Sequence, residues 1–168
     1  MSLDEKIWCK QLEEYPKADE CIGKSATKTN TLPSYQYLYK LKNEIPKELY
    51  AYQFRRLLAY NTANVPMDFR LKMFQDVDRD DIMYQEELDA ICQWGERVII
   101  YRGASKNEEK PGLSWSLKRD IAESSDFHQG RLFIAEIHTS NILLYLSKDT
   151  DEEEVIAHVI DNYEIIDD

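Results

Sequence analysis

The stretch R-V-I-I-Y-R-G at residues 97–103 decides the fold, because the hydrophobic period of the chain changes there. Before it, apolar residues recur at helical spacing in 47–60, 67–75 and 84–94, and in 47–60 this spacing places Leu49, Tyr52, Leu57 and Tyr60 on one face. Gly95 is placed to end the last of these helices. After it, short runs rich in Val, Ile and Tyr are bounded by Gly, Asn, Asp and Ser, which is typical of strands. The expected strands are 97–103, 112–117, 131–137, 141–146, 153–160 and 163–166.

Helices that precede strands along the chain favour an α+β fold over alternating βαβ units. We therefore predict one α+β domain at 46–168, with N-terminal helices packed on a small, mostly antiparallel, split sheet. Residues 1–45 are expected to be an N-terminal extension, in which 32–41 have apolar residues close enough for a helical turn. Among the strands, 117–125 is the only helical candidate. The alternative is an unrelated α+β domain whose acidic residues only decorate the surface.

Composition bounds the class of protein. The 168 residues include 21 Lys and Arg, 32 Asp and Glu, and 43% hydrophobic residues, which suits one domain with a real core. No apolar run approaches the ~20 residues of a membrane span, and acids occupy the place of a secretory signal. We therefore expect a soluble, cytoplasmic protein without a membrane partner. An acidic chain that lacks a basic stripe also argues against nucleic-acid binding.

The last twenty residues carry nine acids and neither Lys nor Arg. Such a charge run usually forms a solvated tail. Here the acids alternate with the apolar runs V-I-A-H-V-I and Y-E-I-I, so the segment is expected to be folded in part.

The cysteines and histidines show no metal-ligand pattern. Cys9, Cys21 and Cys92 are widely spaced and odd in number, which predicts reduced thiols rather than a disulfide framework or a zinc site. The three histidines, which fall ten and twenty residues apart, are expected to be ordinary: His128, His138 and His158.

One acidic segment resembles a calcium loop. In D-V-D-R-D-D-I-M-Y-Q-E-E, the acids at the first, third, fifth and twelfth positions are Asp76, Asp78, Asp80 and Glu87. The sixth position, which needs Gly for a sharp turn, is Asp81. We therefore expect an acid-rich helix N-terminus, where acids favour the helix dipole, and no bound metal.

A stronger constellation has three parts in order. Arg102 follows the apolar strand 98–101, so the strand is expected to hold its side chain in a fixed direction. Its planar guanidinium group can donate two parallel hydrogen bonds, which suits contacts with a phosphate or a ribose. Ser114 and Ser116 lie on one face of a short strand that enters a helix. Glu152 and Glu154 lie two residues apart near the start of a later strand, where an extended backbone would point both to the same face.

These motifs resemble the ADP-ribosyltransferase superfamily in its Arg/Ser/Glu, toxin-like branch. The matching segments are Y-R-G at 101–103, G-L-S-W-S-L-K-R-D-I-A-E-S at 112–124 and E-E-E-V-I at 152–156. The flanking residues are similar to those of small bacterial and prophage proteins of this type. The resemblance covers about residues 98–160.

The resemblance implies NAD as the substrate and a mono-ADP-ribosyltransferase or NAD glycohydrolase activity. Glu154 would stabilise the oxocarbenium-like state that forms when the nicotinamide–ribose bond breaks, and Glu152 would orient or deprotonate the acceptor. The acceptor would be a protein or a small molecule. The residues expected to bind the cofactor are Arg102, Gly103, Ser114 and Ser116.

Other features of the sequence leave different functions open. Only eleven residues separate Arg102 from Ser114, and their loop contains no aromatic residue to stack on nicotinamide. Trp115, which points away from the serines in a strand, is expected to belong to the core. A non-enzymatic binding module or phage-derived protein that keeps the fold without the activity is the rival hypothesis. A phage structural or assembly role has no positive signal in the sequence.

Overall fold

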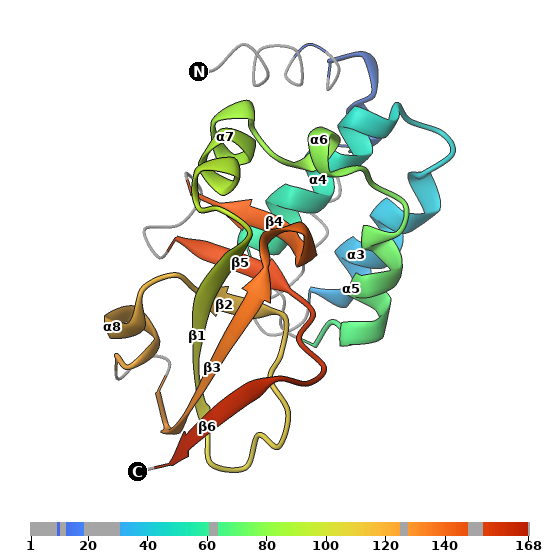
Figure 1. Ribbon diagram of the computed structural model, residues 1–168. Coiled ribbons are helices and arrows are strands. Elements are labelled where there is room, and N and C mark those ends of the chain that lie inside the picture. Colours follow the sequence, from blue (N-terminus) through green and yellow to red (C-terminus); the bar gives the residue numbers. More distant parts are fainter. Residues whose placement is uncertain are drawn as a thin grey trace. The chain divides into compact units, whose positions relative to one another are not determined.

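The computed structural model describes residues 10, 13–18, 31–60, 64–124, 128–147 and 153–167. The chain divides into two compact units, Met1–Tyr84 and Gln85–Asp168. Among the described residues, the first unit is helical and the strands lie in the second unit (Figure 1). The expectation that an extension ends at residue 45 stays a prediction, as does the packing of the N-terminal helices on the sheet.

Four helices make up the described part of the first unit: α3 (Leu32–Leu41), α4 (Lys47–Tyr60), α5 (Met67–Phe74) and α6 (Arg79–Ile82). The helical spacing in 47–60 and 67–75 and the expected turn in 32–41 are thus confirmed, whereas the four-residue α6 was not predicted.

Aromatic rings form part of the core of this unit. The ring of Phe54 packs edge-on against Tyr35 and Phe74, with centroid distances of 6.2 and 4.8 Å. The apolar face of α4 includes Leu49 and Leu57 as the sequence predicts. Tyr52, which was expected on that face, is only half-buried.

The second unit begins with α7 (Gln85–Gln93), and Gly95 follows it with a φ of +85°. This left-handed conformation suits glycine and ends the helix as expected. Buried Glu87 fixes the first turn of α7, because its carboxylate accepts hydrogen bonds from the amide and the hydroxyl of Ser147 at 3.0 and 2.9 Å.

In the part of the chain that the structure describes, six antiparallel strands form one sheet in the order β4-β5-β2-β1-β3-β6. The strands are β1 (Arg97–Ser105), β2 (Ser114–Ser116), β3 (Gly130–His138), β4 (Ile142–Leu146), β5 (Glu154–Ala157) and β6 (Tyr163–Asp167). Figure 1 shows β1, β3 and β6 side by side. The α+β class and the antiparallel sheet are therefore confirmed.

The middle of the sheet is its narrowest part. Strands β1 and β2 are joined by a single register pair, Tyr101 with Ser116, whereas β1 and β3 pair along nine residues. The sheet is thus continuous, but its halves β4-β5-β2 and β1-β3-β6 meet over a short contact. The helix α8 (Arg119–Ala122) follows β2 and packs on β1 and β2 at this junction.

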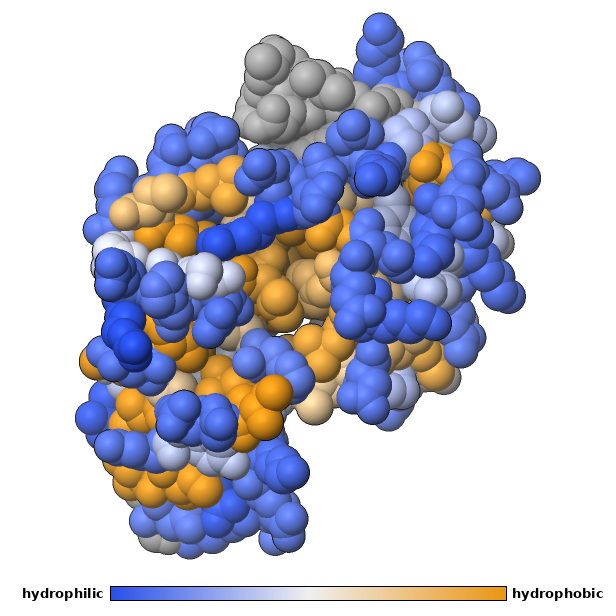
Figure 2. Space-filling view, turned by 45° about the vertical axis from the view of Figure 1, so that its right-hand side comes forward, coloured by the Kyte–Doolittle hydropathy of each residue, from blue (hydrophilic) through white to orange (hydrophobic). Residues whose placement is uncertain are grey.

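The surface agrees with the high charge of the chain. On the face drawn in Figure 2, hydrophilic residues cover most of the surface and hydrophobic residues appear in patches between them. Among the described residues, no helix combines the length and the apolar character that crossing a bilayer requires.

Candidate functional site

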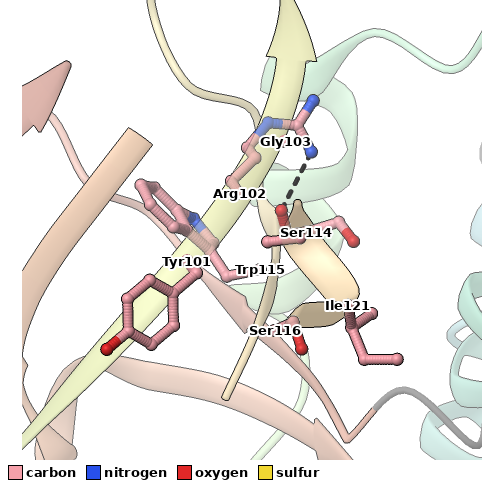
Figure 3. A pocket seen from close by; sticks show the side chains of 8 residues that line it. Tyr101, Arg102, Gly103, Ser114, Trp115, Ser116 and Ile121 are labelled. Atoms are coloured by element: carbon pink, nitrogen blue, oxygen red, sulfur yellow. Dashed lines mark hydrogen bonds between the residues drawn. The ribbon is translucent and has the colours of Figure 1, made fainter. Parts of the chain in front are cut away.

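A small pocket opens at the junction of β1, β2 and α8 (Figure 3). Its volume is about 40 Å³, which is room for a few water molecules and far below that of a typical cofactor cleft. The residues that line it include four of the predicted site residues together with part of α8: Arg102, Gly103, Ser114, Ser116, Ile121 and Ala122.

The predicted serine and glutamate of the motif meet directly. In the β2–β5 ladder, Ser116 lies opposite Glu154 and Ser114 lies opposite Ile156. Ser114 and Glu154 are therefore diagonal neighbours on one face of the sheet. The hydroxyl of Ser114, which lines the pocket, donates a hydrogen bond to Oε1 of Glu154, a residue that is not itself part of the pocket lining.

The predicted arginine joins this pair through the main chain. Nη1 of Arg102 donates to the carbonyl oxygen of Ser114 at 2.9 Å. Its Nε and Nη2 donate to Oε1 of Glu108 at 3.1 and 2.8 Å. The hydrogen bonds Arg102–Ser114–Glu154 thus link the three elements of the motif, although Arg102 and Glu154 do not bond to each other.

A glycine makes room for this arginine. A Cβ added at Gly112 would lie 3.1 Å from Nη2 and 3.2 Å from Cζ of Arg102. Any larger residue there would press on the guanidinium, so Gly112 helps to place Arg102 against the start of β2. Neither Gly112 nor Glu108 was predicted from the sequence to belong to the site.

The remaining residues of β2 have structural roles. Ser116 is buried, and its Oγ accepts a hydrogen bond from the amide of Lys118 at 2.9 Å, which ties the end of β2 to the start of α8. Trp115 is only 2% exposed, and its ring points away from the hydroxyls of Ser114 and Ser116 (Figure 3). The expectation that Trp115 belongs to the core is confirmed. Within the described part of the chain, its indole N–H has no hydrogen-bond partner.

The acidic run does not begin as an extended strand. Strand β5 starts at Glu154, and Glu153 has a φ of +48°, in the left-handed region. The alternation that was expected to place Glu152 and Glu154 on one face therefore fails at Glu153, because alternation requires an extended backbone. Glu152 lies outside the described residues. Glu153 instead forms an exposed ion pair with Lys118 at 3.4 Å.

The segment that resembles a calcium loop contains α6, and Glu87 lies in α7. In the parts of the chain that the structure describes, no three His, Cys, Asp or Glu side chains gather closely enough to hold a metal ion. Cys92 is an exposed free thiol, and the other two cysteines lie outside the described residues.

Comparison with known proteins gives no match: no protein-family model, no curated protein and no solved structure resembles the chain closely enough to be counted. The function therefore rests on the residues of the site.

Proposed function

We propose that the protein is an NAD-dependent mono-ADP-ribosyltransferase or NAD glycohydrolase. One observation carries the proposal: Ser114, which lines a pocket together with Arg102, holds the carboxylate of Glu154 through its hydroxyl. A fixed carboxylate of this kind suits chemistry in which positive charge develops on a ribose.

The reaction breaks the bond between nicotinamide and C1′ of the ribose. Nicotinamide leaves with the bonding electron pair, and the ribose passes through an oxocarbenium-like state, as in glycoside cleavage. Glu154 stabilises the positive charge of that state, and Ser114 keeps the carboxylate in place. An oxygen or nitrogen nucleophile of water or of the acceptor then forms the new bond to C1′ and gives up a proton.

Two further residues complete the assignment. Arg102 binds the diphosphate or the ribose of NAD, for which its guanidinium must turn from Glu108 towards the substrate. Glu152 orients the acceptor or takes its proton. The role of Glu152 stays a prediction from the motif, as does a cytoplasmic location.

The rival function is a binding module that no longer processes NAD. It is favoured by the ion pair between Arg102 and Glu108 at 2.8 Å, which already satisfies the cation that would hold the diphosphate. The small volume of the pocket points the same way, because NAD must then lie across the surface or open the site.

Two measurements on the unmodified chain separate these functions. The first is nicotinamide release from NAD, which the enzyme shows and the binding module lacks. The second is a thermal-shift titration, in which NAD at 100 times its dissociation constant stabilises the protein by about 2.7 kcal/mol. If the chain releases no nicotinamide and shows no thermal shift with millimolar NAD, the proposed activity is excluded.

A further inference from the structure

A second pocket lies entirely within the helical unit, with a volume of about 280 Å³. The C-terminal end of α3, the first turn of α4 and the segment after α5 surround it. Its polar lining includes Lys42, Asn43, Lys47, Tyr50, Asp76 and Asp78. The volume approaches the lower end of the range for small-molecule sites.

Tyr50, one of the residues that line this pocket, carries a buried hydroxyl. Tyr50 is only 2% exposed, and among the described residues its hydroxyl has no hydrogen-bond partner. Burial raises the pKa of Tyr50 above its ordinary value, with a further contribution from the charge of Asp76, so the hydroxyl keeps its proton. A buried donor without an acceptor is destabilising, which makes this hydroxyl a ready donor to a bound molecule.

Two of the charged residues that line the pocket form an ion pair with each other, and two do not. Lys42 donates to both carboxylate oxygens of Asp76, at 2.9 and 3.0 Å, so these two charges satisfy each other. Lys47 and Asp78 form no hydrogen bond or ion pair through their side chains within the described part of the chain. The pocket therefore offers one cation and one anion of its own.

The positive group stands beside the buried hydroxyl. Lys47 and Tyr50 are three residues apart in the first turn of α4, which makes them neighbours on the helix surface. The N-terminal turn of a helix also carries partial positive charge. This side of the pocket thus suits a carboxylate, whereas Asp78 suits an ammonium group.

We infer that this pocket binds a free amino acid or a similarly small zwitterion. Its carboxylate accepts a hydrogen bond from the hydroxyl of Tyr50 and pairs with Lys47, and its ammonium group lies against Asp78. A simple anion would leave the charge of Asp78 uncompensated. A simple cation would face Lys47 and would offer no acceptor to Tyr50. The inference is independent of the activity proposed for the sheet.

Isothermal titration calorimetry of the full chain with glycine, serine and glutamine, each in turn, tests this site. We expect at least one of them to bind in the millimolar range or better. The N-acetyl derivative and the methyl ester of that amino acid each remove one charge, and each should bind about tenfold more weakly, as expected for one lost charged hydrogen bond.

Variants then locate the site. Tyr50→Phe keeps the buried ring and removes only the hydroxyl, so it should weaken binding several-fold without lowering the melting temperature of the ligand-free protein. Lys47→Gln should weaken binding of the amino acid, and Lys40→Gln, an exposed lysine of α3 outside the pocket, is the matched control.

Three outcomes would overturn the inference. One is no binding of any of the three amino acids at millimolar concentration. Another is equal affinity for the amino acid and either derivative, which would indicate a site for a simple ion. The third is binding that Tyr50→Phe and Lys47→Gln leave unchanged while circular dichroism shows both variants to be folded.

Discussion

The guanidinium of Arg102 is ion-paired with the carboxylate of Glu108, with 2.8 Å between Nη2 and Oε1. Glu108 is itself held in place, because Nη1 of Arg131 donates to its main-chain carbonyl at 2.9 Å. An acid of the 103–113 loop thus sits where the proposed function requires the phosphate of a substrate. Binding of a diphosphate to Arg102 must compete with this internal anion.

Replacing this acid should therefore improve NAD binding. Glu108→Gln keeps the shape of the side chain and removes its charge, so Arg102 is released to the substrate. A partly exposed ion pair contributes up to about 1 kcal/mol, which predicts up to a fivefold lower dissociation constant for NAD in a thermal-shift or calorimetric titration. The control is Glu109→Gln, an exposed neighbour that does not bond to Arg102. Equal affinities for Glu108→Gln, Glu109→Gln and the wild type would show that Arg102 does not bind the substrate.

The carboxylate that Ser114 holds should matter most for chemistry. Glu154→Gln preserves the shape of the side chain but loses the charge that stabilises the oxocarbenium-like state. We expect nicotinamide release to fall by at least ~100-fold, as on removing one preorganised electrostatic group. Ser114→Ala should reduce release less, because the carboxylate remains and only its positioning is lost.

The neighbouring acids provide the matched comparison. Glu153 forms an exposed ion pair with Lys118, so Glu153→Gln should leave nicotinamide release nearly unchanged. Glu152→Gln should spare NAD hydrolysis and reduce labelling of an acceptor. Similar small losses for Glu152→Gln, Glu153→Gln and Glu154→Gln would mean that the run is only an acidic turn, and the enzymatic proposal would then be abandoned.

The fold was largely predictable because hydrophobic period reports which faces are buried. The change of period at residue 97 separates α3 to α7 from the strands, and the short helix α8 lies among the strands within the segment 117–125 where a helix was expected. Helix α6 was missed because four residues are too few to show a period. The buried side of α4 was predicted only in part. Tyr50 and Tyr52 are the same residue type, so only the packing of the helix decides that Tyr50 is buried and Tyr52 half-buried.

The site was predictable to a smaller extent. Strand order along the chain and the motif spacing indicated that Arg102, Ser114 and Glu154 lie near one another, and hydrogen bonds connect them. The partner of Arg102 was not predictable, because the conformation of the loop alone brings Glu108 to it. The left-handed backbone of Glu153 is likewise a product of tertiary context, since the residue type favours other conformations.

A buried carboxylate in α7 should be important for stability. Glu87 is 1% exposed and accepts two hydrogen bonds from Ser147, which joins α7 to the end of β4. Glu87→Ala removes the acceptor of the partly buried amide and hydroxyl of Ser147, so we expect a loss of about 1–3 kcal/mol in the free energy of unfolding, measured by urea denaturation. Glu86→Gln, on the exposed side of the same turn, is the control and should change stability little. A neutral Glu87→Ala would contradict this anchoring role.

The ion pair at the edge strand β6 should produce acid sensitivity. Hydrogen bonding to Arg131 lowers the pKa of Asp167 below its ordinary value of 3.8. A carboxylate whose pKa is lower in the folded state stabilises the protein above its unfolded-state pKa, and this stabilisation is lost as the pH falls through the folded-state value. Asp167→Asn should therefore lower the urea midpoint at neutral pH and reduce the loss of stability below about pH 4. The control is Glu164→Gln on the same strand. An acid dependence identical to that of the wild type would show that the pair contributes nothing.

The left-handed residue that precedes Glu154 offers a test of backbone strain. Glu153 has a φ of +48°, which costs a residue with a side chain about 1–2 kcal/mol and costs glycine little. Two effects reduce the stability that a Glu153→Gly variant gains from relief of this strain. Glycine has greater freedom in the unfolded chain, and the exposed ion pair with Lys118 is lost. We still expect Glu153→Gly to be at least as stable as the wild type, by up to about 1 kcal/mol in urea denaturation.

Asn162 supplies the comparison for this strain, because its φ of +59° is similar and asparagine tolerates the left-handed region better than glutamate. Asn162→Gly should therefore gain less than Glu153→Gly. Glu153→Ala keeps the Cβ and should recover none of the gain. If Glu153→Gly is clearly less stable than Glu153→Ala, the backbone at this position is not strained, and the entry into β5 is fixed by the side chain of Glu153 instead.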